Sequence, residues 1–210
     1  MKHTLLLLLL MLSALALFGR TGDETGPDVA VAIYTRFAYP PSPRVFQQMK
    51  TELAAIMAPL RFDWFALKDA NGHQSMAELV VVSFNGVCRD DPVAVVQPPS
   101  GNLGWTYFTH NEILPYAFVD CDRIRGLIEQ ALAVSPPAER ARLMGRGMAR
   151  VLAHELYHFL TQTRNHASSG LGKAVYTGAD LVSDHFQFGA AQSRLLRQSW
   201  QHLQAETAQQ

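Results

Sequence analysis

Hydrophobic residues recur with two different spacings along this chain, and the spacing predicts where strands and helices form. Short runs rich in β-branched and aromatic residues, bounded by glycine, proline or asparagine, predict strands at residues 29–37, 62–67, 78–84, 93–96, 104–109 and 116–120. The Asn71-Gly72 pair predicts a turn between the second and third of these strands. The predicted strands therefore lie mostly in the first half of the chain.

Apolar residues three and four positions apart predict helices at residues 42–59, 122–134, 135–163 and 177–204. Ser42 before Pro43 is a favourable helix start, because a serine oxygen accepts an N-terminal N–H and proline fits the first turn. Ser135 before two prolines predicts the start of the third helix in the same way. This order predicts an α+β domain, in which a twisted mixed sheet packs on the third helix and a C-terminal helix follows.

The third predicted helix carries two unusual patterns. Gly145 and Gly147 each cost about 1 kcal/mol inside a helix unless close packing compensates, so they indicate a tight contact there. Arg142, Arg146 and Arg150 recur every four residues and therefore share one face. We interpret this arginine stripe as a solvated face.

The first residues have the composition of a secretory signal peptide. Lys2 and His3 precede a leucine-rich run that stays apolar to Phe18, and Ala14-Leu15-Ala16 and Gly19 supply small residues for cleavage. The run is short for a membrane-spanning helix. The chain thus divides into a signal peptide at 1–19, cleaved after about residue 16–19, a short linker at 20–28 and one domain at 29–210. We expect the mature domain to be periplasmic or extracellular.

Charge and cysteine content add to this picture. The chain has 18 basic and 18 acidic residues, and cleavage removes Lys2, which leaves 17 against 18 and a net charge of −1. Such a balance predicts neither nucleic-acid binding nor stable membrane association after cleavage. Cys88 and Cys121 both lie in the exported part, where an oxidising compartment favours a disulfide between them.

The segment His154-Glu155-Leu156-Tyr157-His158 carries the pattern with the clearest chemistry. Residues four apart lie on one helix face, so His154 and His158 can direct two imidazole nitrogens at one zinc ion. Glu155 lies beside them as the candidate general base toward a zinc-activated water. The flanking residues argue against a solvated helix face, because they are apolar: Met148, Val151, Leu152, Ala153, Leu156, Phe159 and Leu160.

The motif resembles that of the zincin metallopeptidases, which implies a zincin-like fold and a third zinc ligand outside the five residues. Thermolysin-like gluzincins use a glutamate from a later helix, but here only Glu206 follows, near the C-terminus. Metzincins have His-Glu-x-x-His-x-x-Gly-x-x-His, and this chain has Thr161 and Arg164 at the last two positions. His166 comes two residues later, after Asn165, which tolerates the left-handed turn that glycine would provide. We therefore expect a metzincin-like site with altered spacing and His166 as third ligand.

Other residues near the motif are weaker candidates. Asp180 and Asp184 are the alternative third ligand, because some zincins use an aspartate. No methionine follows His166 to form the methionine turn of the metzincins, but Tyr176 lies in that region. Tyr176 is a candidate to support the site or an oxyanion, or else a core residue.

Further aromatic and histidine side chains receive ordinary interpretations. We expect the aromatic residues of the 104–109 strand in the core rather than at a substrate edge, namely Trp105, Tyr107 and Phe108. Three further histidines are expected at the surface or in satisfied positions, namely His73, His110 and His202.

The site residues support three hypotheses about function. The first is an exported zinc-dependent metallopeptidase that hydrolyses a peptide or protein substrate, with Glu155 as general base. The second is a non-catalytic zincin-fold protein, with a structural or relic zinc, that acts as a binding module. The third is a chance motif in a binding protein without zinc. Glu155 favours the first hypothesis, because a structural zinc site has no use for a carboxylate in that place.

The residues after the motif also resemble those of a group of bacterial exported proteins. The shared pattern is His-Glu-Leu-Tyr-His, then Thr-x-x-His, then Gly-Leu-Gly-Lys-Ala-Val-Tyr-Thr. This resemblance implies export and no particular substrate.

Overall fold

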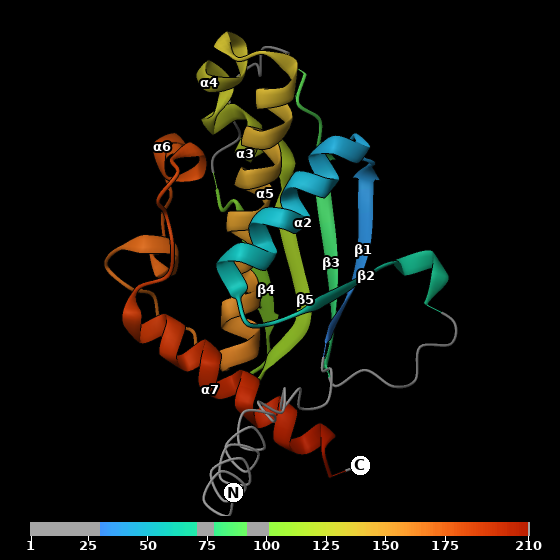
Figure 1. The fold of residues 1–210 in the computed structure, drawn as a ribbon, viewed down its shortest axis with the longest axis vertical. Coiled ribbons are helices and arrows are strands. Elements are labelled where there is room, and N and C mark those ends of the chain that lie inside the picture. The colour runs from blue at the N-terminus through green and yellow to red at the C-terminus, as the bar shows by residue number, and fades with distance from the viewer. Residues whose placement is uncertain (1–29, 71–77, 92–100, 210) are drawn as a thin grey trace, which may run out of the picture.

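The computed structural model describes residues 30–70, 78–91 and 101–209, which form an α+β domain (Figure 1). Its elements are β1 Val31–Tyr39, α2 Pro43–Met57, β2 Phe62–Ala66, η1 Leu67–Asp69, β3 Glu78–Val87, β4 Gly104–Phe108, β5 Ile113–Asp120, α3 Cys121–Leu127, α4 Glu129–Val134, α5 Pro137–Thr161, η2 Gly170–Gly172, α6 Gly178–Val182 and α7 Ala190–Thr207. No helix in these ranges is both long enough and apolar enough to span a bilayer. The predicted leader and linker, the turn at residues 71–72 and the strand at 93–96 lie outside the described residues.

The five strands form one mixed sheet in the order β2-β1-β3-β5-β4. Strands β2, β1, β3 and β5 run parallel to one another. Strand β4 pairs antiparallel with β5, so that Trp105 lies opposite Phe118. The first part of the inner strand β1, residues 31–35, is buried on both faces, as expected for a mostly apolar run in a parallel sheet. Strand β4 therefore forms one edge of the sheet, beside the helix that carries the histidines.

Helices α2 and α5 lie side by side across one face of the sheet (Figure 1). They meet at Gly145, where an added Cβ would lie 2.8 Å from the carbonyl oxygen of Val45 and 2.6 Å from Cβ of Gln48. A Cβ added at Gly147 would likewise lie 2.8 Å from Cγ2 of Ile124. The close contact that compensates for two helical glycines is therefore present. The predicted α+β architecture, with a mixed sheet on the motif helix and a C-terminal helix after it, is confirmed.

Several predicted helix boundaries are wrong. The helix expected at 122–134 consists of α3 and α4, which are separated at Ile128. Ser135 does not cap α5, whose N-cap is Pro136, and the carbonyl oxygen of Ser135 instead accepts a hydrogen bond from Arg140. The helix expected at 177–204 is divided into α6 and α7 by a non-helical segment at 183–189.

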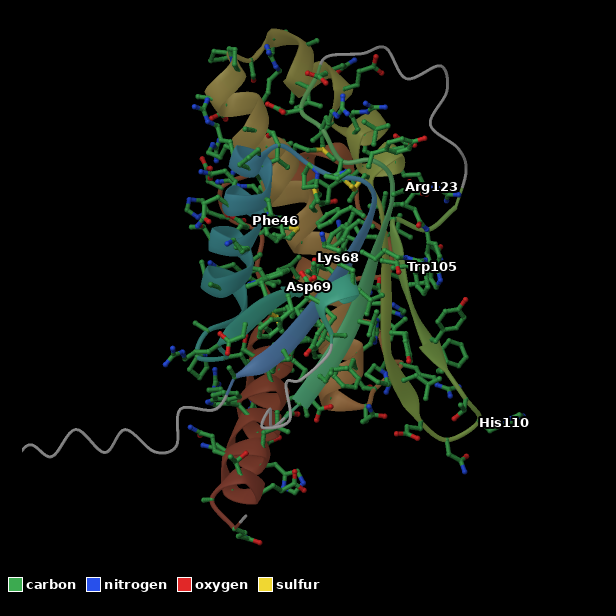
Figure 2. All side chains as sticks on the ribbon, turned by 90° about the vertical axis from the view of Figure 1, so that its right-hand side faces the viewer. Phe46, Lys68, Asp69, Trp105, His110 and Arg123 are labelled. Carbon is green, nitrogen blue, oxygen red and sulfur yellow. A yellow bond between two sulfur atoms is a disulfide. The ribbon has the colours of Figure 1, made fainter. Side chains whose placement is uncertain are left out.

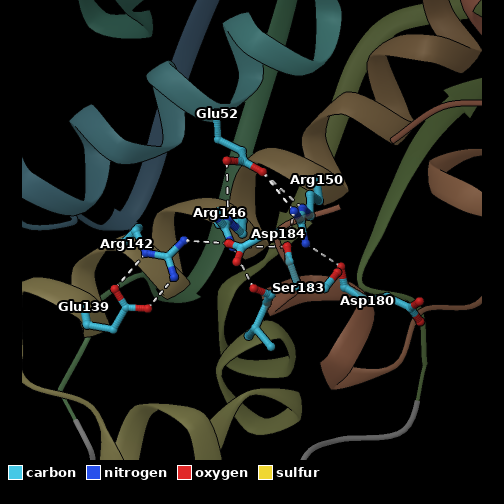
Figure 3. Close-up of polar contacts among 9 residues, drawn as sticks. Glu52, Glu139, Arg142, Arg146, Arg150, Asp180, Ser183 and Asp184 are labelled. Atoms are coloured by element: carbon cyan, nitrogen blue, oxygen red, sulfur yellow. Dashed lines mark hydrogen bonds and ion pairs between the residues drawn. The ribbon is translucent and has the colours of Figure 1, made fainter. Parts of the chain in front are cut away.

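The arginine stripe explains that division, and its interpretation as a solvated face is wrong (Figure 3). Arg150 is only 1% exposed, and it forms an ion pair with Glu52 of α2 at 3.1 Å. Its guanidinium also donates to the carbonyl oxygens of Asp180 and Ser183, and Arg146 donates to those of Val182 and Ser183. Carbonyls at the end of α6 are thus satisfied by arginines and not by a continuing helix.

Replacing Arg150 by glutamine should lower the free energy of unfolding by about 3–5 kcal/mol, because the buried guanidinium loses its ion pair with Glu52 and its hydrogen bonds to the carbonyl oxygens of Asp180 and Ser183. The matched change Arg142→Gln lies two turns earlier on the same helix. Arg142 is 35% exposed and pairs with Glu139, so its loss should cost less than about 1 kcal/mol. Urea unfolding of both variants in the presence of a metal chelator measures the difference. Equal losses would contradict the burial argument.

The predicted disulfide between Cys88 and Cys121 is confirmed, and both residues are fully buried. Cys88 follows β3 directly and Cys121 begins α3, so the bridge joins the carboxyl ends of the neighbouring parallel strands β3 and β5. The backbone N–H of Val87 also donates to the carboxylate of Asp122 at 3.0 Å. The beginning of α3 is therefore attached to the sheet by one covalent and one polar contact.

The double change Cys88→Ser and Cys121→Ser should lower the free energy of unfolding by about 3–4 kcal/mol, because the bridge closes a 33-residue separation. Changing both residues avoids a free thiol that would exchange. Urea midpoints of the oxidised wild type, the double variant and the reduced wild type give the comparison. The reduced wild type should resemble the double variant, and an unchanged midpoint in both would contradict the prediction.

Candidate metal centre

Three histidines meet at the C-terminal part of α5. One ring nitrogen from each of His154, His158 and His166 lies within 4.8 Å of the others. Nε2 of His154 and Nε2 of His158 are 3.0 Å apart, as expected for residues one turn apart on a helix. The His166 ring packs against both, with ring centroids at 5.2 Å and 4.9 Å. The structure thus brings together the three residues that the sequence indicated as ligands.

Backbone carbonyls orient the first two rings. Nδ1 of His154 donates to the carbonyl oxygen of Leu171 at 2.7 Å, and Nδ1 of His158 donates to that of Thr163 at 2.6 Å. Each neutral ring therefore carries its proton on Nδ1 and directs the Nε2 lone pair at the other ring. A hydrogen bond from the far ring nitrogen to a backbone carbonyl is typical of histidines that bind metal ions.

This donor set fits a zinc ion. Two Nε2 lone pairs at 3.0 Å repel each other unless a proton or a cation lies near both. A proton is disfavoured, because burial lowers the pKa of His154 to about 4 and lowers that of His158. A divalent metal ion satisfies both lone pairs, and three imidazoles are a common protein ligand set for zinc.

Glu155 lies beside the histidines and faces the edge strand. Its side chain is 5% exposed, and the hydroxyl of Thr106 on β4 donates to Oε2 at 2.6 Å. Burial raises the pKa of Glu155 to about 7, and the Thr106 hydrogen bond opposes this shift. Gly104 leaves room for the carboxylate, because an added Cβ would lie 2.9 Å from Oε1. Sequence analysis missed both β4 residues, which only strand placement brings next to Glu155.

The other candidates lie in different contacts. Tyr176 donates a hydrogen bond to the carbonyl oxygen of Leu171, and its hydroxyl oxygen is 3.1 Å from Nδ1 of His154. Asp180 accepts from Lys173 and from the backbone of Thr177, where it completes a capping box. The structure therefore places Tyr176 in contact with His154 and engages the Asp180 carboxylate outside the cluster.

Asp184, the other alternative ligand, pairs with Arg146 at 2.8 Å and with Arg142 at 3.5 Å. It belongs to the arginine network and not to the histidine cluster. The remaining described histidines are exposed, and His202 contacts Glu206 at 3.2 Å. His73 lies outside the described residues.

The left-handed residue at the end of α5 is not the one that the sequence predicted. Gln162, not Asn165, adopts the left-handed conformation, with φ of 48°. Its side chain accepts a hydrogen bond from the backbone N–H of Ile113 at 2.9 Å and donates to the carbonyl of Ile113 at 3.1 Å. These hydrogen bonds offset the free-energy cost of the left-handed backbone, and they fix the β4–β5 hairpin to the end of α5.

The histidines and Glu155 line a cleft of about 670 Å³ between α5, β4 and the segment 173–176. Phe108 and Trp105 also line it, and Phe108 is 60% exposed and Tyr107 52% exposed. Figure 2 shows Trp105 on β4 and His110 at the end of the β4–β5 hairpin. The interpretation of these aromatics as core residues is wrong for Tyr107 and Phe108.

Comparisons with known proteins give likeness of structure and not of sequence. No protein-family model matches the sequence, and no curated protein matches it. The structure is similar to the crystal structure of archaemetzincin from Methanopyrus kandleri, with a TM-score of 0.49 and 10% sequence identity. The likeness covers 82% of this chain and 96% of that one. The likeness concerns the arrangement of the chain at most.

Proposed function

We propose that this protein is an exported zinc-dependent metallopeptidase that hydrolyses peptide bonds, with Glu155 as general base. The observation that carries the proposal is the pair of Nε2 atoms 3.0 Å apart, with each Nδ1 already bonded to a backbone carbonyl. His154, His158 and His166 would hold the ion. Bound zinc supplies a Lewis acid that polarises the scissile carbonyl and makes a water molecule more acidic.

Glu155 is suited to move a proton in this reaction. A carboxylate with a pKa of about 7 accepts a proton from the attacking water and can release it to the leaving amine. The Thr106 hydrogen bond fixes Oε2 of Glu155, and Oε1 lies beside Gly104 of β4. Tyr176 supports His154, and its hydroxyl stays protonated, because burial raises the pKa of Tyr176.

The sheet edge supports a peptide as substrate. Strand β4 is the edge strand, and it borders the cleft with Gly104, Trp105 and Thr106. One side of an edge strand has backbone N–H and C=O groups free of partners, and an extended peptide can pair with them. A closed site with four protein ligands would favour the binding-module alternative. Asp180 and Asp184 could supply such a fourth ligand, but both carboxylates have other partners.

The test compares zinc-loaded protein with chelator-treated protein on a mixture of short unstructured peptides, with cleavage followed by mass spectrometry. Cleavage should require zinc and should return when zinc is added back. A protein that binds one zinc tightly and cleaves no peptide would overturn the metallopeptidase proposal and favour the binding module. A protein that binds no zinc would favour the chance motif.

Export is the part of the proposal that the disulfide supports, because such bridges persist in oxidising compartments. The mature protein should be periplasmic or extracellular, should act on a peptide or protein substrate, and should bind neither nucleic acid nor membranes stably. N-terminal sequencing of protein recovered from the periplasm or medium should show a start after about residue 16–19. An intact Met1 in recovered protein would contradict cleavage.

A further inference from the structure

The cleft carries three cationic side chains whose charges are compensated to different extents. Arg123, Arg164 and Lys173 line it, and Glu155 is the only acidic residue in its described lining. Arg123 pairs with Asp120 at 3.0 Å, and Lys173 pairs with Asp180 at 2.8 Å. Arg164 has no carboxylate partner within the described parts of the chain, and its guanidinium donates only to the carbonyl oxygen of Thr109. One uncompensated positive charge therefore faces the cleft.

The backbone places Arg164 next to the candidate metal ligands. The residue before it, Thr163, accepts the Nδ1 hydrogen bond of His158, and His166 follows two residues later. Asn165 also donates a backbone hydrogen bond to Oγ1 of Thr163 at 3.2 Å, which tightens the turn. The main chain around Arg164 is therefore fixed by the same contacts that orient the histidine cluster.

The side chain of Arg164 is held as well. Its guanidinium carbon lies 4.1 Å from the centroid of the Phe108 ring, a distance at which the planar cation stacks on the aromatic face. The Gln162 contacts fix the hairpin that carries Phe108 and Thr109. An arginine held in this way loses little conformational entropy on binding, and it keeps N–H groups available for a planar anion. The stacking also explains an exposed phenylalanine at this position.

We propose that Arg164, stacked on Phe108, is a specificity-determining residue that binds a carboxylate of the substrate. This proposal rests on the metallopeptidase function proposed above and names its substrate class, peptides with a carboxylate beside the scissile bond. A guanidinium and a carboxylate form two parallel N–H···O bonds, which an amide cannot reproduce. The carboxylate belongs either to an acidic side chain or to the C-terminus of the peptide.

Matched peptides distinguish these two sources. Starting from a peptide that the zinc-loaded protein cleaves, each of the three positions on either side of the scissile bond is made glutamate or glutamine, and the C-terminus is made free or amidated. The favoured acid should raise kcat/KM about tenfold to hundredfold over its neutral isostere. A glutamate effect identifies a side-chain carboxylate, and an effect of the free C-terminus identifies the terminal one.

Variants test whether Arg164 causes the preference for a carboxylate in the substrate. Arg164→Gln should reduce the ratio of kcat/KM for the acidic peptide to kcat/KM for the neutral peptide to near one. Arg164→Lys should retain part of this preference, because lysine keeps the charge but cannot form two parallel N–H···O bonds. Arg197→Gln removes the same charge from the exposed face of α7, and it should leave the ratio unchanged. Equal ratios in the wild type and Arg164→Gln would overturn the proposal while leaving the peptidase function in place.

A binding measurement separates the two proposals when no peptide is cleaved. Peptide hydroxamates that chelate zinc, with glutamate or glutamine at the first three positions, are titrated against zinc-loaded wild type and Arg164→Gln. Tighter binding of a glutamate compound, about tenfold or more and lost in the variant, would support the carboxylate site even without turnover. Equal binding of every pair by the wild type would overturn it.

Discussion

Replacing Glu155 by glutamine should abolish measurable peptide hydrolysis while the zinc content of the protein stays the same. General-base catalysis contributes about 10²–10⁴-fold to such reactions, and the amide of glutamine cannot take a proton from water. The isosteric side chain still accepts the Thr106 hydrogen bond, so Thr106 and β4 keep their positions. The expected result is a loss in kcat, measured on the zinc-loaded variant with the best cleaved peptide.

Stability measurements show whether Glu155→Gln loses activity through the missing base or through a destabilised fold. In the metal-free protein, the folded-state pKa of Glu155 lies near 7, above the ordinary value, so ionisation of the buried carboxylate destabilises the fold as the pH rises through 7. Glutamine has no such cost, and the variant should be at least as stable as the wild type at pH 8. Glu206→Gln, on the exposed end of α7, is the matched control and should retain activity. Hydrolysis by Glu155→Gln at the wild-type rate would exclude Glu155 as the base.

Local patterns in the sequence predicted the parts of this structure that depend on local contacts. Ser42 caps α2 as expected, because an N-cap bond joins residues only three positions apart. The histidine pair follows from helical geometry alone, and the disulfide was predicted from an even pair of cysteines in a chain expected to be exported. The order of one strand, one helix, several strands and then helices indicated the α+β class.

Contacts between distant residues could not be predicted in this way. Arg150 looks like part of a solvated stripe, but its partner Glu52 is 98 residues earlier, and its other acceptors are backbone carbonyls with no sequence signature. Gln162 adopts the left-handed turn because its side chain bonds to Ile113, 49 residues away. Intrinsic propensity favours Asn165 for that turn, and the tertiary contact outweighs it.

The aromatic residues of β4 illustrate the same limit at the cleft. Phe108 resembles a core residue in a sequence, and it is exposed because it supports the guanidinium of Arg164, 56 positions later in the chain. Whether Thr106 would face Glu155 depended on which side of the edge strand turned toward α5. Pairing of β4 with β5 fixes that side, and no local pattern in the chain encodes it.

Replacing His166 by alanine should remove zinc from the purified protein, with the dissociation constant raised about hundredfold or more. Two nitrogens from one helix turn would remain, and they cannot hold a catalytic zinc ion without a third ligand. His166 is the informative ligand to change, because it is exposed, whereas His154 and His158 are each 8% exposed and bonded to backbone carbonyls. The metal-free variant should therefore unfold at the same urea concentration as the metal-free wild type.

The increase in folding stability on zinc binding provides a second measurement for His166→Ala. At a free zinc concentration one hundred times the wild-type dissociation constant, binding stabilises the folded wild type by about 2.7 kcal/mol, and the variant should gain about 0.4 kcal/mol or less at the same concentration. His202→Ala removes an exposed imidazole from α7 and should keep both the zinc and the increment. Zinc bound to His166→Ala with wild-type affinity would mean that another group supplies the third ligand. The carboxylates of Asp180 and Asp184 would then have to leave Lys173 and Arg146, and Asp180→Asn or Asp184→Asn in the His166→Ala background would identify which one does so.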